Sequence, residues 1–265
     1  MFIPRKALVW VLAGFVLAGG YLVFDSLAPR EEPVMQEVIY RARSSDPPVF
    51  YVKTQEKLLA LTFDIGWGSR TLPLILPVLD RFDQKATFFV AAPWAKEHPN
   101  LVKQIVEAGH EIASHGDKHD NLSQFSREQV AKNISRAHRV IKEVSGVEPR
   151  FFRPPYGDYD DLVVATAREL GYETIIWSVD SMDWKNPGVD YMIRRVTREI
   201  FPGAILLFHA SDSCRQTHQA LPTIIQNLRA QGYQLVTLGE LFEAGEPGRD
   251  DPRGKPYKPN MPRES

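Results

Sequence analysis

Between residues 58 and 238, short apolar runs of strand character alternate with stretches of helical periodicity, and this alternation constrains the fold more than any other feature. LLALTFD (58–64) and AILLFH (204–209) have the pattern of buried strands. Residues 126–144 have apolar positions at helical spacing, with Ser126 as a candidate N-cap and Gly146 after the helix. Strands that alternate with helices form a parallel sheet with right-handed crossovers. About seven such units favour a barrel over an open sheet.

The remaining elements continue the same rhythm. Further strands are predicted at 86–90, 110–114, 151–152, 173–179 and 233–238. Further helices are predicted at 69–82, 98–108, 160–170, 189–200 and 216–230.

The two ends of the chain differ from this central part. Arg5 and Lys6 precede an uncharged apolar run at 7–24, which as a helix spans roughly 27 Å, close to the thickness of the bilayer hydrocarbon. The positive charge on its N-terminal flank predicts a membrane anchor with the rest of the chain outside the cytoplasm. A cleaved signal segment and a buried helix are the alternatives. Residues 25–54 are predicted to be a linker and 243–265 a proline-rich disordered tail, which leaves 55–242 as the folded domain.

Composition adds two constraints. The formal net charge is −1, so the chain has no overall electrostatic attraction to nucleic acid. Cys214 is the single cysteine, so the chain cannot form an internal disulfide.

Polar residues of chemical interest follow the predicted strands rather than being scattered among them. Because active sites of parallel α/β folds form where strands end, we expect these side chains to meet at one edge of the sheet. They are Asp64, His115, Arg153, Asp180, Asp183 and His209.

Each of these positions is suited to a particular role. His115 and His119 lie four residues apart, a spacing that suits one divalent metal, although two such histidines also occur as caps or surface residues. Asp64, followed by Gly66 and Gly68, is placed to act as a general base. Asp183 could raise the pKa of the His209 imidazole and make it a general acid.

Two further features suggest how a substrate is held. The stiff loop RPPYG (153–157) could carry a backbone N–H directed at an oxyanion, and its Arg153 could hold a carboxylate by a bidentate pair. Trp67 and Trp184 could line a sugar groove, whereas core packing is favoured for Trp94 and Trp177.

In this order, five motifs resemble the NodB-homology polysaccharide deacetylases, carbohydrate esterase family 4. The resemblance covers about residues 55–242, and the neighbouring ATFFV and GHEIASHG look like the sporulation-associated PdaB branch. The motifs are TFDIGWG (62–68), SHGDKH (114–119), RPPYG (153–157), DSMDW (180–184) and LFH (207–209).

The resemblance implies a distorted (β/α) barrel that removes N-acetyl groups from an amino-sugar polymer such as peptidoglycan, with a divalent metal, zinc, as cofactor. The implied roles are a water-activating base for Asp64, metal ligands for His115 and His119, and a general acid for His209 supported by Asp183 and Trp184. Leu207 would form the acetyl pocket, Tyr156 would supply an oxyanion N–H, and Arg153 matches the arginine of the third motif.

One position departs from the family pattern. The aspartate that serves as third metal ligand is Ile65 here, and isoleucine cannot bind metal. A glycan-binding pseudoenzyme is therefore an alternative function. A thiol hydrolase that uses Cys214 with His209 or His218 is a third hypothesis.

Overall fold

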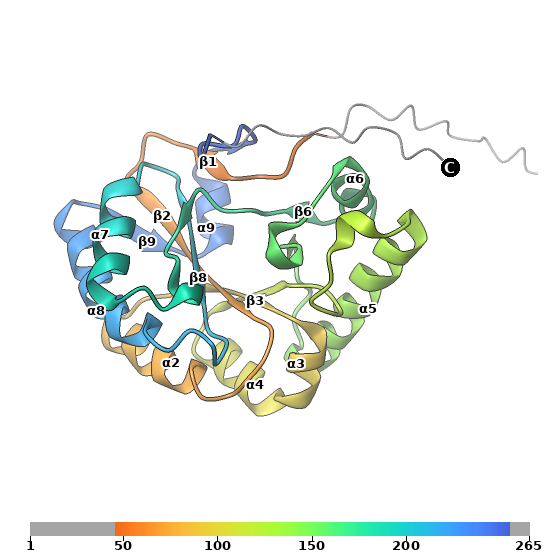
Figure 1. Cartoon of the computed structure of the whole chain (residues 1–265), viewed down its shortest axis with the longest axis horizontal. Coiled ribbons are helices and arrows are strands. Elements are labelled where there is room, and N and C mark those ends of the chain that lie inside the picture. The colour runs from red at the N-terminus through yellow and green to blue at the C-terminus, as the bar shows by residue number, and fades with distance from the viewer. Residues whose placement is uncertain (1–45, 255–265) are drawn as a thin grey trace, which may run out of the picture. The chain divides into compact units, whose positions relative to one another are not determined.

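The computed structural model describes residues 46–254, which form a curled parallel sheet with helices outside it (Figure 1). This half-barrel has the parallel α/β architecture that the sequence predicts. It is not a closed barrel, because the sheet has two edges. The strands are β1 Tyr51–Lys53, β2 Leu58–Ile65, β3 Thr87–Val90, β4 Glu111–Ser114, β5 Phe151–Phe152, β6 Glu173–Thr174, β7 Val179–Asp180, β8 Ile205–His209, β9 Gln234–Val236 and β10 Glu246–Gly248.

Most helices lie around the convex side of the strands in Figure 1. They are α2 Leu72–Arg81, α3 Ala92–Glu97, α4 Pro99–Glu107, α5 Arg127–Ser145, α6 Asp161–Glu169, α7 Val189–Glu199, α8 Thr217–Ala230 and α9 Leu238–Glu243. Short 3₁₀ turns occupy Leu122–Gln124, Pro155–Gly157 and Asp183–Lys185.

Strand β2 is the centre of the sheet. The sheet runs in the order β6-β5-β4-β3-β2-β8-β7, and β9 pairs with the first residues of β2 beside β8. All these pairings are parallel, so the carboxyl ends of the strands lie at one edge. The register places Asp64 directly opposite His209.

Alternation along β2 separates two faces. Leu59, Leu61, Phe63 and Ile65 belong to the large core between the sheet and the outer helices. Ala60 belongs to a smaller cluster on the concave side. Because side chains alternate along a strand, residues 62 and 64 share the face of Ala60, so Asp64 enters the concave side of the sheet.

The sequence prediction was wrong at several places, and one of them is the predicted linker 25–54, which contains β1. The predicted strand 173–179 is divided into β6 and β7. Between them, Ile175 forms an isolated bridge with Val49, and Tyr51 forms a second isolated bridge with Ala204. The last predicted strand is shorter than expected, because α9 begins at Leu238 with a capping box from Thr237. The predicted tail begins with β10, which pairs antiparallel with β1.

Other local predictions are confirmed. Ser126 caps α5 in a capping box with Gln129, and Gly146 ends that helix with φ +73°. No helix within residues 46–254 is long and apolar enough to span a membrane. The apolar run predicted to be an anchor, 7–24, lies outside the described residues.

Candidate functional site

The polar residues that follow the strands meet at the carboxyl edge of the sheet. Asp64 is the last residue but one of β2, His115 follows β4, Arg153 follows β5, and His209 ends β8. Asp64 Oδ1 lies 2.7 Å from Arg153 Nη1, and Asp64 Oδ2 lies 3.9 Å from His115 Nε2. The juxtaposition expected from the strand order is therefore present.

Asp64 is a buried carboxylate held by a buried arginine. Arg153 Nη1 also donates to Thr62 Oγ1 at 2.9 Å, and Nη2 donates to the Ile176 carbonyl at 3.1 Å, so the arginine holds Asp64 by one nitrogen and the bidentate pair is not formed. The guanidinium stacks 3.9 Å from the ring centroid of Phe89. Burial alone would raise the pKa of the Asp64 carboxyl, but Arg153 outweighs it and the pKa lies below its usual value. Asp64 is therefore ionised at neutral pH.

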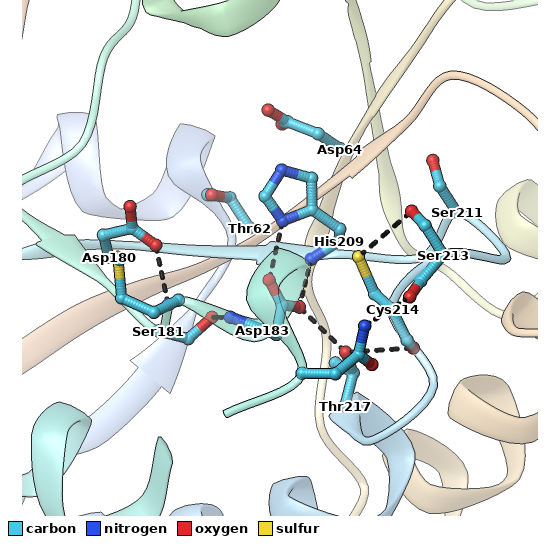
Figure 2. Close-up of polar contacts among 12 residues, drawn as sticks. Thr62, Asp64, Asp180, Ser181, Asp183, His209, Ser211, Ser213, Cys214 and Thr217 are labelled. Carbon is cyan, nitrogen blue, oxygen red and sulfur yellow. Dashed lines mark hydrogen bonds and ion pairs between the residues drawn. The ribbon is translucent and has the colours of Figure 1, made fainter. Parts of the chain in front are cut away.

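His209 faces Asp64 across the strand pair and is supported from behind by Asp183 (Figure 2). Asp183 Oδ1 accepts from His209 Nδ1 at 2.7 Å, and Oδ2 accepts from the His209 backbone N–H at 2.7 Å. Burial would lower the pKa of His209, but the charge and hydrogen bond of Asp183 outweigh it and raise the pKa to about 9. The imidazolium can therefore carry a proton on Nε2 at neutral pH.

Thr217 is a member of this group that sequence reasoning missed. Its hydroxyl donates to Asp183 Oδ2 at 2.8 Å, and its side chain is fully buried (Figure 2). Thr217 is the first residue of α8, where a threonine ordinarily suggests a helix cap. No sequence signal distinguishes such a cap from a partner of Asp183.

The loop after β2 is fixed by the segment after β8. Gly66 N–H donates to Ser211 Oγ at 2.9 Å, and Asp212 accepts from the backbone of Arg70 and Thr71 at 2.7 and 3.0 Å. A Cβ at Gly68 would lie 2.3 Å from the carboxyl carbon of Asp212, so this close approach requires glycine. Sequence reasoning also missed Ser211 and Asp212.

His115 and His119 lie together as the sequence suggested, with ring centroids 5.3 Å apart. The Arg153 carbonyl accepts from His115 Nδ1 at 2.9 Å, which leaves Nε2 with a free lone pair, as in metal-binding histidines. Burial lowers the pKa of His115 to about 4, so its imidazole is neutral. Burial also lowers the pKa of His119.

The third ligand position does not fit a catalytic metal. Ile65 is fully buried in the outer core, so the position after Asp64 supplies no carboxylate. A catalytic zinc site ordinarily has three protein ligands, and this chain offers two imidazoles with Asp64 already bound to Arg153. The residues present therefore do not complete the family's metal sphere.

Another group could offer metal ligands within residues 46–254. Ligand atoms of Asp183, His209 and Cys214 lie within 4.8 Å of one another. The first two already bond each other. Burial, with the charge of Asp183, raises the pKa of the Cys214 thiol to about 12. A protonated and buried thiol is a poor ligand and a poor nucleophile, so the structure does not support the thiol hydrolase hypothesis.

Exposed aromatic side chains lie near the site, and Trp67 and Tyr156 pack against His119 with ring centroids 5.3 and 4.2 Å apart. Trp67 is 46% exposed, Tyr156 66% and Trp184 47%. Tyr156 has φ +60°, an uncommon conformation for a non-glycine residue that is typical of functional loops. Trp94 is 2% exposed and Trp177 packs beside the concave cluster, as expected. Leu207 is buried beside Thr62 in the strand register.

Several proteins that are similar to this chain are polysaccharide deacetylases. Residues 51–175 match the family model described as polysaccharide deacetylase. A peptidoglycan-N-acetylglucosamine deacetylase of Bacillus cereus (strain ATCC 14579) is 38% identical over 194 residues, which cover 72% of this chain and 91% of that protein. The uncharacterized protein YlxY of Bacillus subtilis (strain 168) is 30% identical over 84% of this chain, which spans 66% of that protein's length.

Two solved structures show the same fold at different levels of activity. The Bc1960 peptidoglycan N-acetylglucosamine deacetylase has a TM-score of 0.71 and 31% identity, and the match covers 75% of this chain and 94% of that one. BA3943 from Bacillus anthracis, a CE4 family pseudoenzyme, has a TM-score of 0.72 and 36% identity, over 76% of this chain and 71% of that one. A mutant of BA3943 is described as having restored enzymatic activity.

Proposed function

Because the chain belongs to the polysaccharide deacetylase family, we propose that it is a hydrolase that removes N-acetyl groups from the amino sugars of peptidoglycan. One observation carries the proposal. An ionised carboxylate, Asp64, and an imidazolium, His209, face each other at the end of two paired strands, with pKa values displaced in opposite directions. Pairs of titratable groups separated in this way are typical of general acid–base catalysis.

We assign one proton transfer to each group. Asp64 takes a proton from the water that attacks the acetamide carbonyl carbon, so that a C–O bond forms. His209 donates its Nε2 proton to the departing sugar nitrogen as the C–N bond breaks, which releases acetate and a free amine. Arg153 and Asp183 keep the two catalytic groups in position. A backbone N–H at Tyr156 would stabilise the oxyanion, and Leu207 would contact the acetyl methyl group.

A divalent metal in the family's site would polarise the acetyl carbonyl. His115 and His119 are the residues of this chain that could bind it. We propose zinc as the metal that these two histidines would bind. The proton transfers above use only the chain's own residues, because the third ligand position holds Ile65.

Acetate release tests the proposal. The full chain is incubated with purified peptidoglycan and with chito-oligosaccharides, with zinc or cobalt added, beside Asp64→Asn. Asp190→Asn, on the exposed side of α7, is the matched control. We expect the parent chain and Asp190→Asn to release acetate, and Asp64→Asn to release none. Equal release from Asp64→Asn and the parent chain would refute the assignment of the base.

Ile65 supports a second candidate, a glycan-binding pseudoenzyme, and BA3943 is a precedent within the fold. An Ile65→Asp variant separates the two candidates. In the absence of metal, the buried carboxylate should destabilise the chain by about 3 kcal/mol. Zinc should restore stability in proportion to its binding, and acetate release should rise. If the parent chain itself releases acetate, the pseudoenzyme is excluded.

The place of action is also a proposal. We infer that residues 7–24 anchor the chain in a membrane, with the catalytic domain outside the cytoplasm where peptidoglycan lies. From the sequence around TFDIGWG we also propose that the chain belongs to the sporulation-associated PdaB branch. Altered muropeptides in spores, rather than in growing cells, of a deletion strain would test that assignment.

A further inference from the structure

Two aromatic side chains join Arg253, in the segment that follows β10, to the loop 153–157. We infer that Arg253 is a positioning residue for this loop. The loop holds Arg153, which binds Asp64, and the Tyr156 N–H that is proposed to stabilise the oxyanion. The inference rests on the proposed function, because it assigns the C-terminal segment a part in the same reaction.

The loop has an uncommon backbone conformation. Tyr156 and Gly157, which are consecutive, have φ +60° and +63°. For a residue other than glycine, such a conformation persists only where surrounding contacts enforce it. Within the loop, the Gly157 N–H donates to the Pro154 carbonyl at 3.0 Å. The direction of the Tyr156 N–H therefore depends on the side chains that pack against the loop.

Two aromatic rings make these contacts. A Cβ added to Gly157 would lie 2.7 Å from Cη2 of Trp177, so the loop backbone touches the indole ring directly. Phe50 meets Tyr159, two residues after the loop, edge to face with ring centroids 6.3 Å apart. At the start of the loop, the guanidinium carbon of Arg153 lies 5.8 Å from the Trp177 ring centroid. A movement of the indole would therefore affect both ends of the loop.

Neither ring belongs to a long strand that would fix its position. Trp177 lies in the segment 175–178, between the two-residue strands β6 and β7. Phe50 precedes the three-residue strand β1, and its N–H donates to the Gly248 carbonyl at 2.9 Å. The positions of the two rings therefore depend on tertiary contacts with the C-terminal segment.

Arg253 lies against both rings at once. Its guanidinium carbon is 5.2 Å from the Trp177 ring centroid and 5.1 Å from that of Phe50, within the range of cation–π contacts. Asp251 fixes the guanidinium by accepting from Nε and Nη2, both at 2.8 Å. The side chains of Arg253 and Asp251 are 18% and 7% exposed, so solvent screens this pair little. Because the guanidinium is flat and its donors form a rigid fork, it can bind the carboxylate and contact the rings together.

Replacement of Arg253 by methionine tests the inference in the full chain. The variant removes the flat cation, so we expect kcat for acetate release from chito-oligosaccharide to fall about tenfold with KM unchanged, because a small displacement of catalytic groups slows the chemical step. Asp251→Asn/Arg253→Met repeats the test without an unpaired carboxylate. Arg229→Met is the matched control, because Arg229 lies 5.9 Å from the Phe82 ring centroid and donates to Gln84 Oε1, away from the site. Its kcat should equal that of the parent chain.

Hydrogen exchange keeps the test separate from catalysis. Exchange is followed by mass spectrometry in a peptide that covers residues 153–160, and we expect it to be about tenfold faster in both Arg253 variants and unchanged in Arg229→Met. This result supports the positioning of the loop even if no chain releases acetate and the proposed function fails. Exchange at the parent rate in the Arg253 variants overturns the inference, whether or not acetate is released. Equal changes in Arg229→Met would assign the effect to general stability and would overturn it as well.

Discussion

At the scale of single residues, the proposed general acid, His209, depends on a carboxylate that is not itself exposed to substrate. Asp183 has no exposed surface and accepts three hydrogen bonds, two from His209 and one from Thr217. A carboxylate buried in this way needs every one of these partners, because an unsatisfied buried charge is costly. The orientation of the imidazole is therefore set by a chain of contacts that begins in α8.

Replacement of Thr217 by valine tests that chain of contacts. Valine keeps the shape but removes the hydroxyl, so we expect kcat to fall about tenfold, equivalent to about 1.4 kcal/mol, with KM unchanged. Thr217→Ser retains the donor and should keep most of the activity. Steady-state kinetics of the two variants gives the comparison. An unchanged kcat in Thr217→Val would show that the hydrogen bond to Asp183 does not matter.

The pKa displacements predict the pH dependence of the reaction. The active form has Asp64 ionised and His209 protonated, so kcat/KM should rise at acid pH and fall as His209 loses its proton at about 9. Asp183→Asn removes the charge that raises the pKa of His209, so the alkaline limb should move to lower pH. The profile is measured from pH 3 to pH 10.5, because the pKa of Asp64 lies below its usual value. An alkaline limb that stays at about 9 in the variant would assign it to another group.

At the scale of elements, the sequence predicted those that have a clear period and missed those that depend on contacts. The amphipathic α5, with its two caps, was predicted from local pattern alone. In contrast, α3 is six residues long and follows Ala91 without a side-chain cap, so no periodicity reveals it. The strand predicted at 173–179 breaks because Val49 pairs with Ile175, a contact between residues far apart in the sequence.

The C-terminal segment is the clearest such case. Residues 246–254 are polar and proline-rich, which predicts disorder, yet β10 pairs with β1, and Arg249 binds both carboxylate oxygens of Glu173 at 3.0 Å. Arg253 stacks over Phe50 and Trp177, with its guanidinium carbon 5.1 and 5.2 Å from the ring centroids. These contacts come from tertiary structure, which composition does not report.

A shortened chain tests how much this segment contributes to the stability of the fold. A chain that ends at residue 242 loses β10 and both arginine contacts, whereas a chain that ends at 254 keeps them. We expect the shorter chain to lose roughly 3 kcal/mol of stability, because several hydrogen bonds and an ion pair disappear together. That loss corresponds to a Tm lower by about 6–12 °C in calorimetry. Equal Tm values for the two chains would show that β10 adds no stability.

At the scale of the whole molecule, the site was easier to predict than its supports. Parallel strands bring their carboxyl ends to one edge, so residues that follow different strands must meet, and Asp64, His115, Arg153 and His209 do. Ser211, Asp212 and Thr217 act by holding loops and charges, and serine, aspartate and threonine serve as caps and turn residues throughout proteins. Their partners follow from distances in the fold, which the sequence does not contain.

Anchoring is the prediction that concerns the entire chain. The apolar run 7–24 is long enough to cross a bilayer, and Arg5 and Lys6 favour retention of its N-terminal flank in the cytoplasm. We therefore expect the full chain to sediment with membranes, to resist extraction by high salt, and to be released by detergent. A chain that starts at residue 46 should stay in the soluble fraction. If expression of the full-length gene instead yields a shortened, soluble protein outside the cytoplasm, residues 7–24 are a cleaved signal segment. The catalytic domain would then be free to diffuse through its polymer.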